Sequence, residues 1–278
     1  MGKVFNVKKT IESYHATKPP LFFGDSPGLF NTVFKPYPKI WSLYKTMKSL
    51  DWSENEFDYT VCNTDFKSCP KSVSDMMIRT LAWQWEADSV ASRAIAPVLA
   101  PFITDTSLWA AWQRISDNEV VHAATYSEIV RMSFDDPEGV LSDILSVHQS
   151  IQRMTAVNTA LGDLYDASHK YALGQITADE AYDVLFIGLV ALLLLERIQF
   201  MASFAVTFTI CSSNWFQPIG KAVQKICQDE LEVHVELDKE VIRTELATDR
   251  GKAAYARLKD RITLLCEEVV ETEMTGVD

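Results

Sequence analysis

Apolar residues recur along most of the chain at the three- and four-residue spacing of one helix face. The first predicted helix is short and spans Ile40–Leu50, and Asp51–Pro70 is expected to be a connection. A long helix should follow, capped by Ser72 or Ser74 and ending near Pro97.

The rest of the chain predicts five further helices, at about residues 105–132, 135–174, 177–211, 219–246 and 248–273. Asp105 is suited to cap the first of these helices, and Thr177 with Glu180 forms a capping box before the third. Strand-like alternation, repeats and Gly/Ser linkers are lacking from the sequence. The pattern therefore predicts an all-α bundle of long helices, one domain over residues 1–278 with an irregular N-terminal segment at about 1–38.

Composition narrows the class of partner. Hydrophobic residues make up 47% of the 278 positions, enough for a substantial core. A net charge of −12 argues against nucleic acid, because a phosphate backbone requires a basic surface. Five cysteines without a CxxC pair are typical of reduced thiols in a cytoplasmic protein. The most apolar run, Val184–Leu195, has 12 residues, which is too short to cross a bilayer, so we expect a buried helix and no membrane.

Acidic residues interrupt the apolar faces of four predicted helices. Asp88 shares a face with Trp85, and Glu119, His122 and Tyr126 form one stripe at i, i+3 and i+7. The other two helices carry the same kind of signal. On one of them, Glu196 follows four leucines and precedes Phe200 and Phe204, and on the other lies the run Asp229–His234.

These buried acids point to bound metal. An ionised carboxylate buried alone is strongly unfavourable, but four carboxylates balance the charge of two divalent cations. Two neutral imidazoles complete such a set, and carboxylate-rich sites with one histidine per metal suit iron or manganese better than zinc or calcium. The sequence therefore predicts a di-metal centre in the bundle core.

Each residue also has a simpler explanation when taken alone. Glu196 could pair with the neighbouring Arg197, and Tyr126 could be an ordinary buried tyrosine with a hydrogen-bonded hydroxyl. Trp52 could be a packing aromatic beside a turn. Glu86 and Glu232 are interpreted as ordinary helix charges rather than ligands.

Taken together, these positions resemble the small subunit of class I ribonucleotide reductase, a ferritin-like di-metal protein. The resemblance runs from about Pro19 to the last helix. The segments that carry it are Pro20–Gly24, Asp51–Asp58, Asp88–Ser89 with Arg93, Glu119–Tyr126, Glu196–Phe204 and Asp229–Glu230.

The resemblance implies a ligand set and a cofactor of two transition-metal ions per chain, iron in the first place, with manganese or a mixed Mn/Fe pair as alternatives. The implied metal ligands are Asp88, Glu119, His122, Glu196, Glu230 and His234.

The resemblance also implies a role for the aromatic residues. Tyr126 would be oxidised to a radical when the reduced metals react with oxygen, although the metals themselves could instead store the oxidant. Trp52, Asp229 and His122 would form the relay to the surface. A cytoplasmic homodimer would then pass the oxidant to a separate large subunit, which reduces ribonucleotides to deoxyribonucleotides.

Two features depart from the family pattern. His234 follows Glu230 at i+4, where the family spacing is i+3, so we expect either a π-bulge between them or a different rotamer in a regular helix, unless His234 faces away. Only 44 residues follow His234, with no tyrosine or tryptophan after Tyr255. Members of the family usually continue into a docking tail, so the chain is expected to be truncated or to dock differently.

Three other functions stay open. A related di-metal oxidase or oxygenase would keep the ligands but lack a Trp52–Asp229–His122 contact and show a ligand cavity beside the metals. A metal-storage protein would form a large shell instead of a dimer. A structural bundle would bind no metal at all.

Overall fold

The structure is a computed structural model that describes residues 18–25, 29–30, 32–146 and 152–275. Over these residues it consists of helices joined by short connections, and this confirms the predicted all-α bundle. In chain order the elements are α2 (Pro38–Ser49), α3 (Val61–Ser68), α4 (Lys71–Ala94), α5 (Ala96–Leu99), the 3-10 turn η1 (Ala100–Phe102), α6 (Thr106–Ser133), α7 (Pro137–Ser146), α9 (Thr155–Ala172), α10 (Ala178–Leu194), the π-turn η2 (Leu195–Phe200), α11 (Met201–Cys211), α12 (Gln217–Asp229), the π-turn η3 (Glu230–His234), α13 (Val235–Leu246) and α14 (Asp249–Thr275).

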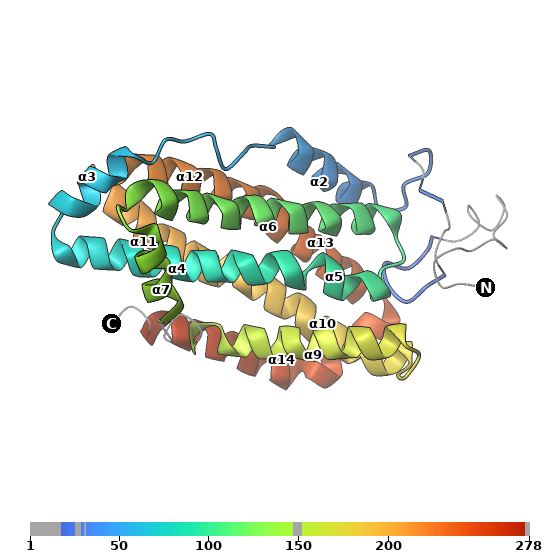
Figure 1. Cartoon of the computed structure of the whole chain (residues 1–278). Coiled ribbons are helices and arrows are strands. Elements are labelled where there is room, and N and C mark those ends of the chain that lie inside the picture. The colour runs from blue at the N-terminus through green and yellow to red at the C-terminus, as the bar shows by residue number, and fades with distance from the viewer. Residues whose placement is uncertain (1–17, 26–28, 31, 147–151, 276–278) are drawn as a thin grey trace.

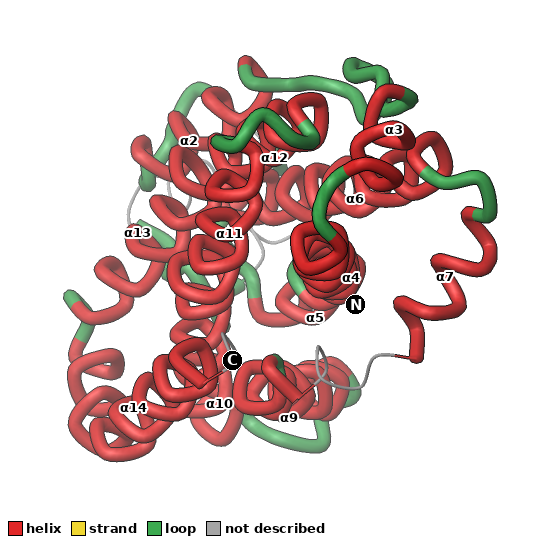
Figure 2. Tube along the Cα trace, turned by 90° about the vertical axis from the view of Figure 1, so that its left-hand side faces the viewer, coloured by secondary structure: helices red, strands yellow, loops and turns green. Residues whose placement is uncertain are grey.

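The long helices run side by side, as Figure 1 shows. Helix α4 packs along α6, and α2 covers α6 from the other side. Helix α10 packs against α9, α13 and α14, and α11, which continues the same helical segment, contacts α4. Seen end-on, α7 stands out from the rest of the bundle (Figure 2). The interior between α4, α6, α10 and α13 is where the predicted ligands lie.

Helix starts follow the expected local chemistry in two places. The Asp105 carboxylate accepts hydrogen bonds from the backbone N–H groups of Ser107 and Leu108, both at 2.9 Å. Thr177 and Glu180 form the predicted capping box of α10. The cap predicted at Ser72 or Ser74 is wrong. Helix α4 already starts at Lys71, because the Pro70 carbonyl accepts the N–H groups of residues 73 and 74.

Two predicted segments differ in the structure. The connection 51–70 contains the short helix α3. The single helix predicted over 135–174 is instead α7 and α9, with residues 147–151 outside the described part. Helix α7 buries Ile144 against Ala82 and Val130 on the outer side of α4 and α6, so it cannot continue along the line of α9. The single domain predicted over residues 1–278 stays a prediction, and of its irregular segment the structure describes 18–25, 29–30 and 32–37.

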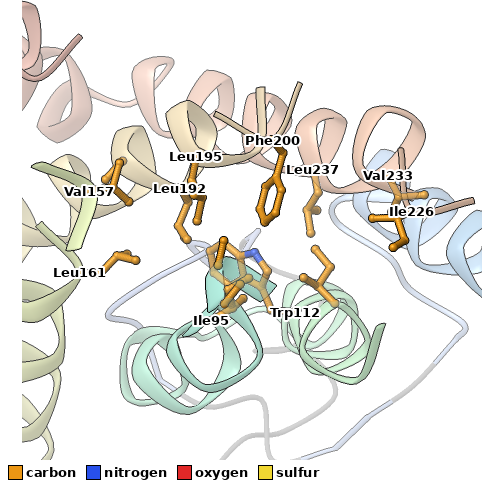
Figure 3. Packing of buried hydrophobic residues seen from close by; sticks show 14 of the residues in the cluster. Ile95, Trp112, Val157, Leu161, Leu192, Leu195, Phe200, Ile226, Val233 and Leu237 are labelled. Atoms are coloured by element: carbon orange, nitrogen blue, oxygen red, sulfur yellow. The ribbon is translucent and has the colours of Figure 1, made fainter. Parts of the chain in front are cut away.

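One apolar cluster joins side chains from almost every helix. Figure 3 shows Trp112, Leu192, Phe200 and Leu237 converging on the same interior. Aromatic and branched side chains from helices far apart in sequence thus pack into one core. The metal-ligand candidates are buried among the same helices.

The central helix corrects one prediction. The uninterrupted helical segment Ala178–Cys211 has 34 residues and a mean hydropathy of 2.1 in its most apolar window, so by length and composition it could cross a membrane. The sequence prediction judged the length from the 12-residue run Val184–Leu195 alone, whereas the apolar helix extends beyond that run on both sides. In this structure 61% of that window is buried, against α9, α13 and α14. The helix also carries Glu196 on its buried side.

Candidate metal centre

Four helical segments bring all six predicted ligands into one buried cluster. None of the six is more than 2% exposed. They are Asp88 on α4, Glu119 and His122 on α6, Glu196 on η2, and Glu230 and His234 on η3.

The cluster contains two overlapping groups of potential metal ligands. One ligand atom from each of Asp88, Glu119, His122 and Glu230 lies within 4.8 Å of the others in the first group. The second group is Glu119, Glu196, Glu230 and His234, under the same limit. Glu119 and Glu230 belong to both groups, so either residue could contribute a ligand atom to each ion. The arrangement can hold two metal ions per chain, as the sequence predicts.

Both imidazoles turn the same nitrogen toward the carboxylates. His122 Nδ1 lies 3.2 Å from Glu119 and 3.4 Å from Glu230. His234 Nδ1 lies 3.1 Å from Glu230 and 3.3 Å from Glu119. The opposite nitrogens bond to Asp229 (His122 Nε2, 3.0 Å) and to the side-chain oxygen of Asn118 (His234 Nε2, 2.9 Å). Protonated at Nε2, each ring presents a free lone pair at Nδ1, the form that binds a metal.

Several polar atoms of the cluster have no hydrogen-bond partner, as is expected of atoms that coordinate a cation. Buried atoms without a partner include both carboxylate oxygens of Asp88 and of Glu230, one oxygen each of Glu119 and Glu196, and His234 Nδ1. Orphaned buried acceptors are rare in proteins because each is costly. Hard carboxylate oxygens with one imidazole per group suit iron or manganese. The residues present therefore fit two such ions.

Burial and neighbouring charges shift the pKa values of the ligand carboxyl groups. Burial raises the pKa of Asp88 well above its ordinary value, and the nearby Glu119 carboxylate raises it further. Burial and the neighbouring Asp238 do the same to the pKa of Glu196. For Glu119 burial also acts to raise the pKa, but the neighbouring His122 and His234 imidazoles outweigh it and bring the pKa to about 2. Without a cation, burial therefore favours the neutral, protonated forms of the Asp88 and Glu196 carboxyl groups.

A hydrogen-bonded chain leads outward from the first group. The indole N–H of Trp52 donates to Asp229 Oδ2 at 2.7 Å, and His122 Nε2 lies 3.0 Å from the same oxygen. The Trp52 and His122 rings are nearly parallel, with centroids 6.0 Å apart. Asp229 is 2% exposed and Trp52 is partly exposed, so these hydrogen bonds connect the interior with the surface. The Trp52–Asp229–His122 contact expected from sequence is present.

Tyr126 lies in the apolar wall one turn beyond His122. It is 1% exposed, and its hydroxyl has no hydrogen-bond partner among the described residues. Burial raises the pKa of Tyr126 well above its ordinary value, and the carboxylates of Asp88 and Glu230 add to this effect. The phenol therefore keeps its proton in a water-poor setting next to the ligand cluster.

The unusual spacing of Glu230 and His234 is explained by a π-turn. Residues Glu230–His234 form η3, which absorbs one extra residue and leaves both side chains facing the cluster. Of the arrangements considered from the sequence, the π-bulge is thus the one present. A second π-turn, η2, carries Glu196, and no sequence signal predicted it. The two π-turns contact each other.

Two buried polar residues were missed by the sequence analysis. Asn118 bridges Asp229 and His234 through its side-chain amide, donating at 3.2 Å and accepting at 2.9 Å. Asp238, 2% exposed, lies close enough to Glu196 for its charge to raise the pKa of that carboxyl group. Each lies on the face of a predicted ligand, Asn118 four positions before His122 and Asp238 four after His234, so the helical period could have found both. Glu232 is exposed, as expected for an ordinary helix charge.

Comparison with known proteins identifies the relatives of this chain. The sequence matches the family described as ribonucleotide reductase, small chain, over residues 30–278. A ribonucleoside-diphosphate reductase subunit beta from Haemophilus influenzae is 25% identical over 225 residues, which are 77% of this chain and 60% of that protein. A protein of the same description from Enterobacteria phage T4 is 23% identical over 265 residues, 87% of this chain and 67% of that protein. The chain spans about 60% of the length of its bacterial relatives.

Solved structures show the same fold. The R2 subunit of ribonucleotide reductase from Clostridium botulinum aligns with a TM-score of 0.80 at 15% identity, covering 99% of this chain and 82% of that one. The dimanganese(II)-NrdF of Streptococcus sanguinis gives 0.72 at 13% identity and 88% and 80% coverage. An R2-like ligand-binding oxidase with a Mn/Fe cofactor gives 0.65 at 14% identity and 88% and 90% coverage. These matches confirm the predicted ferritin-like bundle, and with the family match over residues 30–278 they place the chain in the ribonucleotide reductase small-chain family.

Proposed function

We propose that this chain is a radical-generating subunit whose six clustered residues bind two transition-metal ions, iron or manganese. The proposed ligands are Asp88, Glu119, His122, Glu196, Glu230 and His234. Support comes from their burial, from the two overlapping groups they form and from the unpartnered atoms they contribute.

The observation that carries the proposal is the Trp52–Asp229–His122 chain, with contacts of 2.7 and 3.0 Å. A metal-storage site needs no such connection to the surface. A di-metal oxidase acting on a bound small molecule does not need it either, so the contact favours the reductase subunit over the R2-like oxidases that share the fold.

When bound by these six residues, two iron or manganese ions would supply the oxygen-dependent oxidising chemistry that acts on Tyr126. The chain's own residues do the rest. Tyr126 holds its proton until oxidation, and the apolar wall around it excludes water that would quench a radical. Asp229 fixes the His122 ring and the Trp52 indole on one oxygen, so electron and proton movement between them needs little rearrangement.

The proposed partners are a second copy of this chain and a separate large subunit that reduces ribonucleotides in the cytoplasm. We propose no nucleic-acid or membrane partner: the net charge is −12, and the one helix apolar enough to span a bilayer lies largely in the core.

Reconstitution tests the proposal. Purified protein supplied with Fe²⁺ or Mn²⁺ and exposed to oxygen should hold two ions per chain and support ribonucleotide reduction only when a large subunit is added. Electron paramagnetic resonance then distinguishes the oxidant: a tyrosyl signal that Tyr126→Phe abolishes assigns it to Tyr126, whereas activity without such a signal assigns it to the metals. Protein that retains only trace metal would refute the proposed function.

A further inference from the structure

Asn118 is a buried amide beside the proposed ligands, and the proposed mechanism gives it no role. It lies on α6, directly before Glu119, and is 6% exposed. Its side-chain N–H donates to Asp229 Oδ2 at 3.2 Å, and its side-chain oxygen lies 2.9 Å from His234 Nε2. Both polar ends of this side chain are therefore used inside the core, one toward Asp229 and one toward a proposed ligand.

The donors and acceptors of these contacts can be assigned from one group. The indole N–H of Trp52 can only donate, and it donates to Asp229 Oδ2 at 2.7 Å, so this carboxylate oxygen is an acceptor. Asn118 then has its N–H group toward Asp229 and its oxygen toward His234. An amide oxygen only accepts, so His234 Nε2 is the donor of that bond. With its proton on Nε2, a neutral His234 ring has its free lone pair on Nδ1.

That lone pair faces the second ligand group. His234 Nδ1 lies 3.1 Å from Glu230 and 3.3 Å from Glu119, which both belong to the group that contains His234. This nitrogen has no hydrogen-bond partner among the described residues. The bond to Asn118 thus matches both the tautomer and the ring orientation that an ion in this group requires.

The same Asp229 oxygen also orients the imidazole of the first group. His122 Nε2 lies 3.0 Å from Asp229 Oδ2, whereas His234 reaches this atom only through Asn118. The two imidazole rings are nearly parallel, with centroids 5.9 Å apart. One carboxylate oxygen therefore holds both rings, one directly and the other through the amide, and the surface chain from Trp52 is connected to both ligand groups.

We propose that Asn118 is a positioning residue of the metal centre, whose amide holds His234 with Nδ1 toward the ion of the second group and connects that ring to Asp229. This inference rests on the proposed function, because it requires the two ions. His122 has its own bond to Asp229, so loss of the amide should weaken binding of the ion in the second group more than binding of the other ion.

Two substitutions separate the bond to His234 from the size of the side chain. Asn118→Leu has similar bulk and removes both hydrogen bonds, whereas Asn118→Asp keeps an oxygen for His234 Nε2 and loses the N–H for Asp229. Metal-free wild type and variants are titrated with Mn²⁺, and free Mn²⁺ is followed by electron paramagnetic resonance.

Asn118→Leu should weaken one of the two binding steps about 10–100-fold, the usual effect of removing an outer hydrogen-bond partner of a metal ligand. At two equivalents of Mn²⁺ its bound metal should then give the signal of an isolated ion in place of that of a coupled pair. Asn118→Asp should bind the weakened ion more tightly than Asn118→Leu does, because His234 still has its acceptor.

Thr125→Val is the matched control from the same helix. Thr125 is also buried, and its hydroxyl donates to the Val121 carbonyl within α6 at 2.8 Å. Valine has the same shape without the hydroxyl, so both Mn²⁺ binding steps should stay as in wild type. Circular dichroism of the metal-free proteins verifies folding, and Asn118→Ala replaces the leucine variant if leucine does not fit.

The inference is wrong if Asn118→Leu binds both ions with wild-type affinity, if Asn118→Asp binds as weakly as Asn118→Leu, or if Thr125→Val shows the same loss. Equal weakening of both steps in Asn118→Leu would also contradict it, since that result indicates a general packing defect. Wild-type protein that binds no Mn²⁺ contradicts the proposed function itself, whereas two ions bound equally well by wild type and Asn118→Leu contradict only the role of Asn118.

Discussion

Metal binding should strongly stabilise this fold, and the structure indicates by how much. Seven ligand atoms of the cluster are buried without a hydrogen-bond partner. Leaving one such atom unpaired costs about 1–3 kcal/mol, so the metal-free cluster weakens the folded state considerably. Ions that coordinate these atoms remove that cost only in the folded state, since the unfolded chain has no assembled site.

The expected shift follows from mass action. With free Mn²⁺ at about 100 times the dissociation constant, each site contributes about 2.7 kcal/mol, and two sites give about 5 kcal/mol. For a chain of this size 1 kcal/mol corresponds to about 2–4 °C, so the melting temperature should rise by roughly 10–20 °C.

Thermal unfolding followed by circular dichroism, in excess Mn²⁺ and in excess chelator, measures this shift. Glu230→Ala should lose most of it, because Glu230 belongs to both ligand groups. Glu232→Ala is the matched control from the same π-turn, since Glu232 is exposed and should keep the full shift. A folded wild-type protein that melts at the same temperature in Mn²⁺ and in chelator would refute the reasoning.

Three further predictions address single residues. Tyr126→Phe should abolish any tyrosyl radical signal while leaving two ions per chain, and a radical that survives the change would place the oxidised residue elsewhere. Trp52→Phe removes the indole donor to Asp229, so turnover with a large subunit should collapse although metal content and radical persist; undiminished turnover would exclude this route. Asp88→Ala and Glu196→Ala should each leave about one ion per chain by metal analysis, because each residue belongs to a single group; loss of both ions in either variant would contradict the two-group assignment.

Sequence reasoning located the cluster because burial and charge conflict there. Glu196 follows four leucines, and burying its ionised carboxylate in a bundle core is strongly unfavourable unless a cation binds it. The stripe of Glu119, His122 and Tyr126 also depends only on helix periodicity, which the structure reproduces in α6. Both signals come from residues close together in the sequence, so they can be recognised without the structure.

Other features depend on contacts between distant segments. The break between α7 and α9 is set by packing of Ile144 on the outer side of α4 and α6, which no local pattern encodes. The hydrogen bonds of Asn118 to Asp229 and to His234 join residues on separate helical segments, and a buried asparagine next to charged residues looks like a surface residue in sequence. Local periodicity therefore predicts which face a residue occupies, but not the partner it meets there.

The paired π-turns divide the cluster into a fixed half and an adaptable half. Asp88, Glu119 and His122 come from α4 and α6, which are regularly wound along their whole length. Glu196, Glu230 and His234 come from η2 and η3, where the wider winding leaves the backbone less tightly bonded. A change in ionic radius or coordination number should therefore be accommodated mainly by small changes of helix winding in η2 and η3, while α4 and α6 hold Asp88, Glu119 and His122 in place. Because Asp229 directly precedes η3, such a change would also reach the Trp52–Asp229–His122 contact, so the choice of metal and the relay are coupled through this turn.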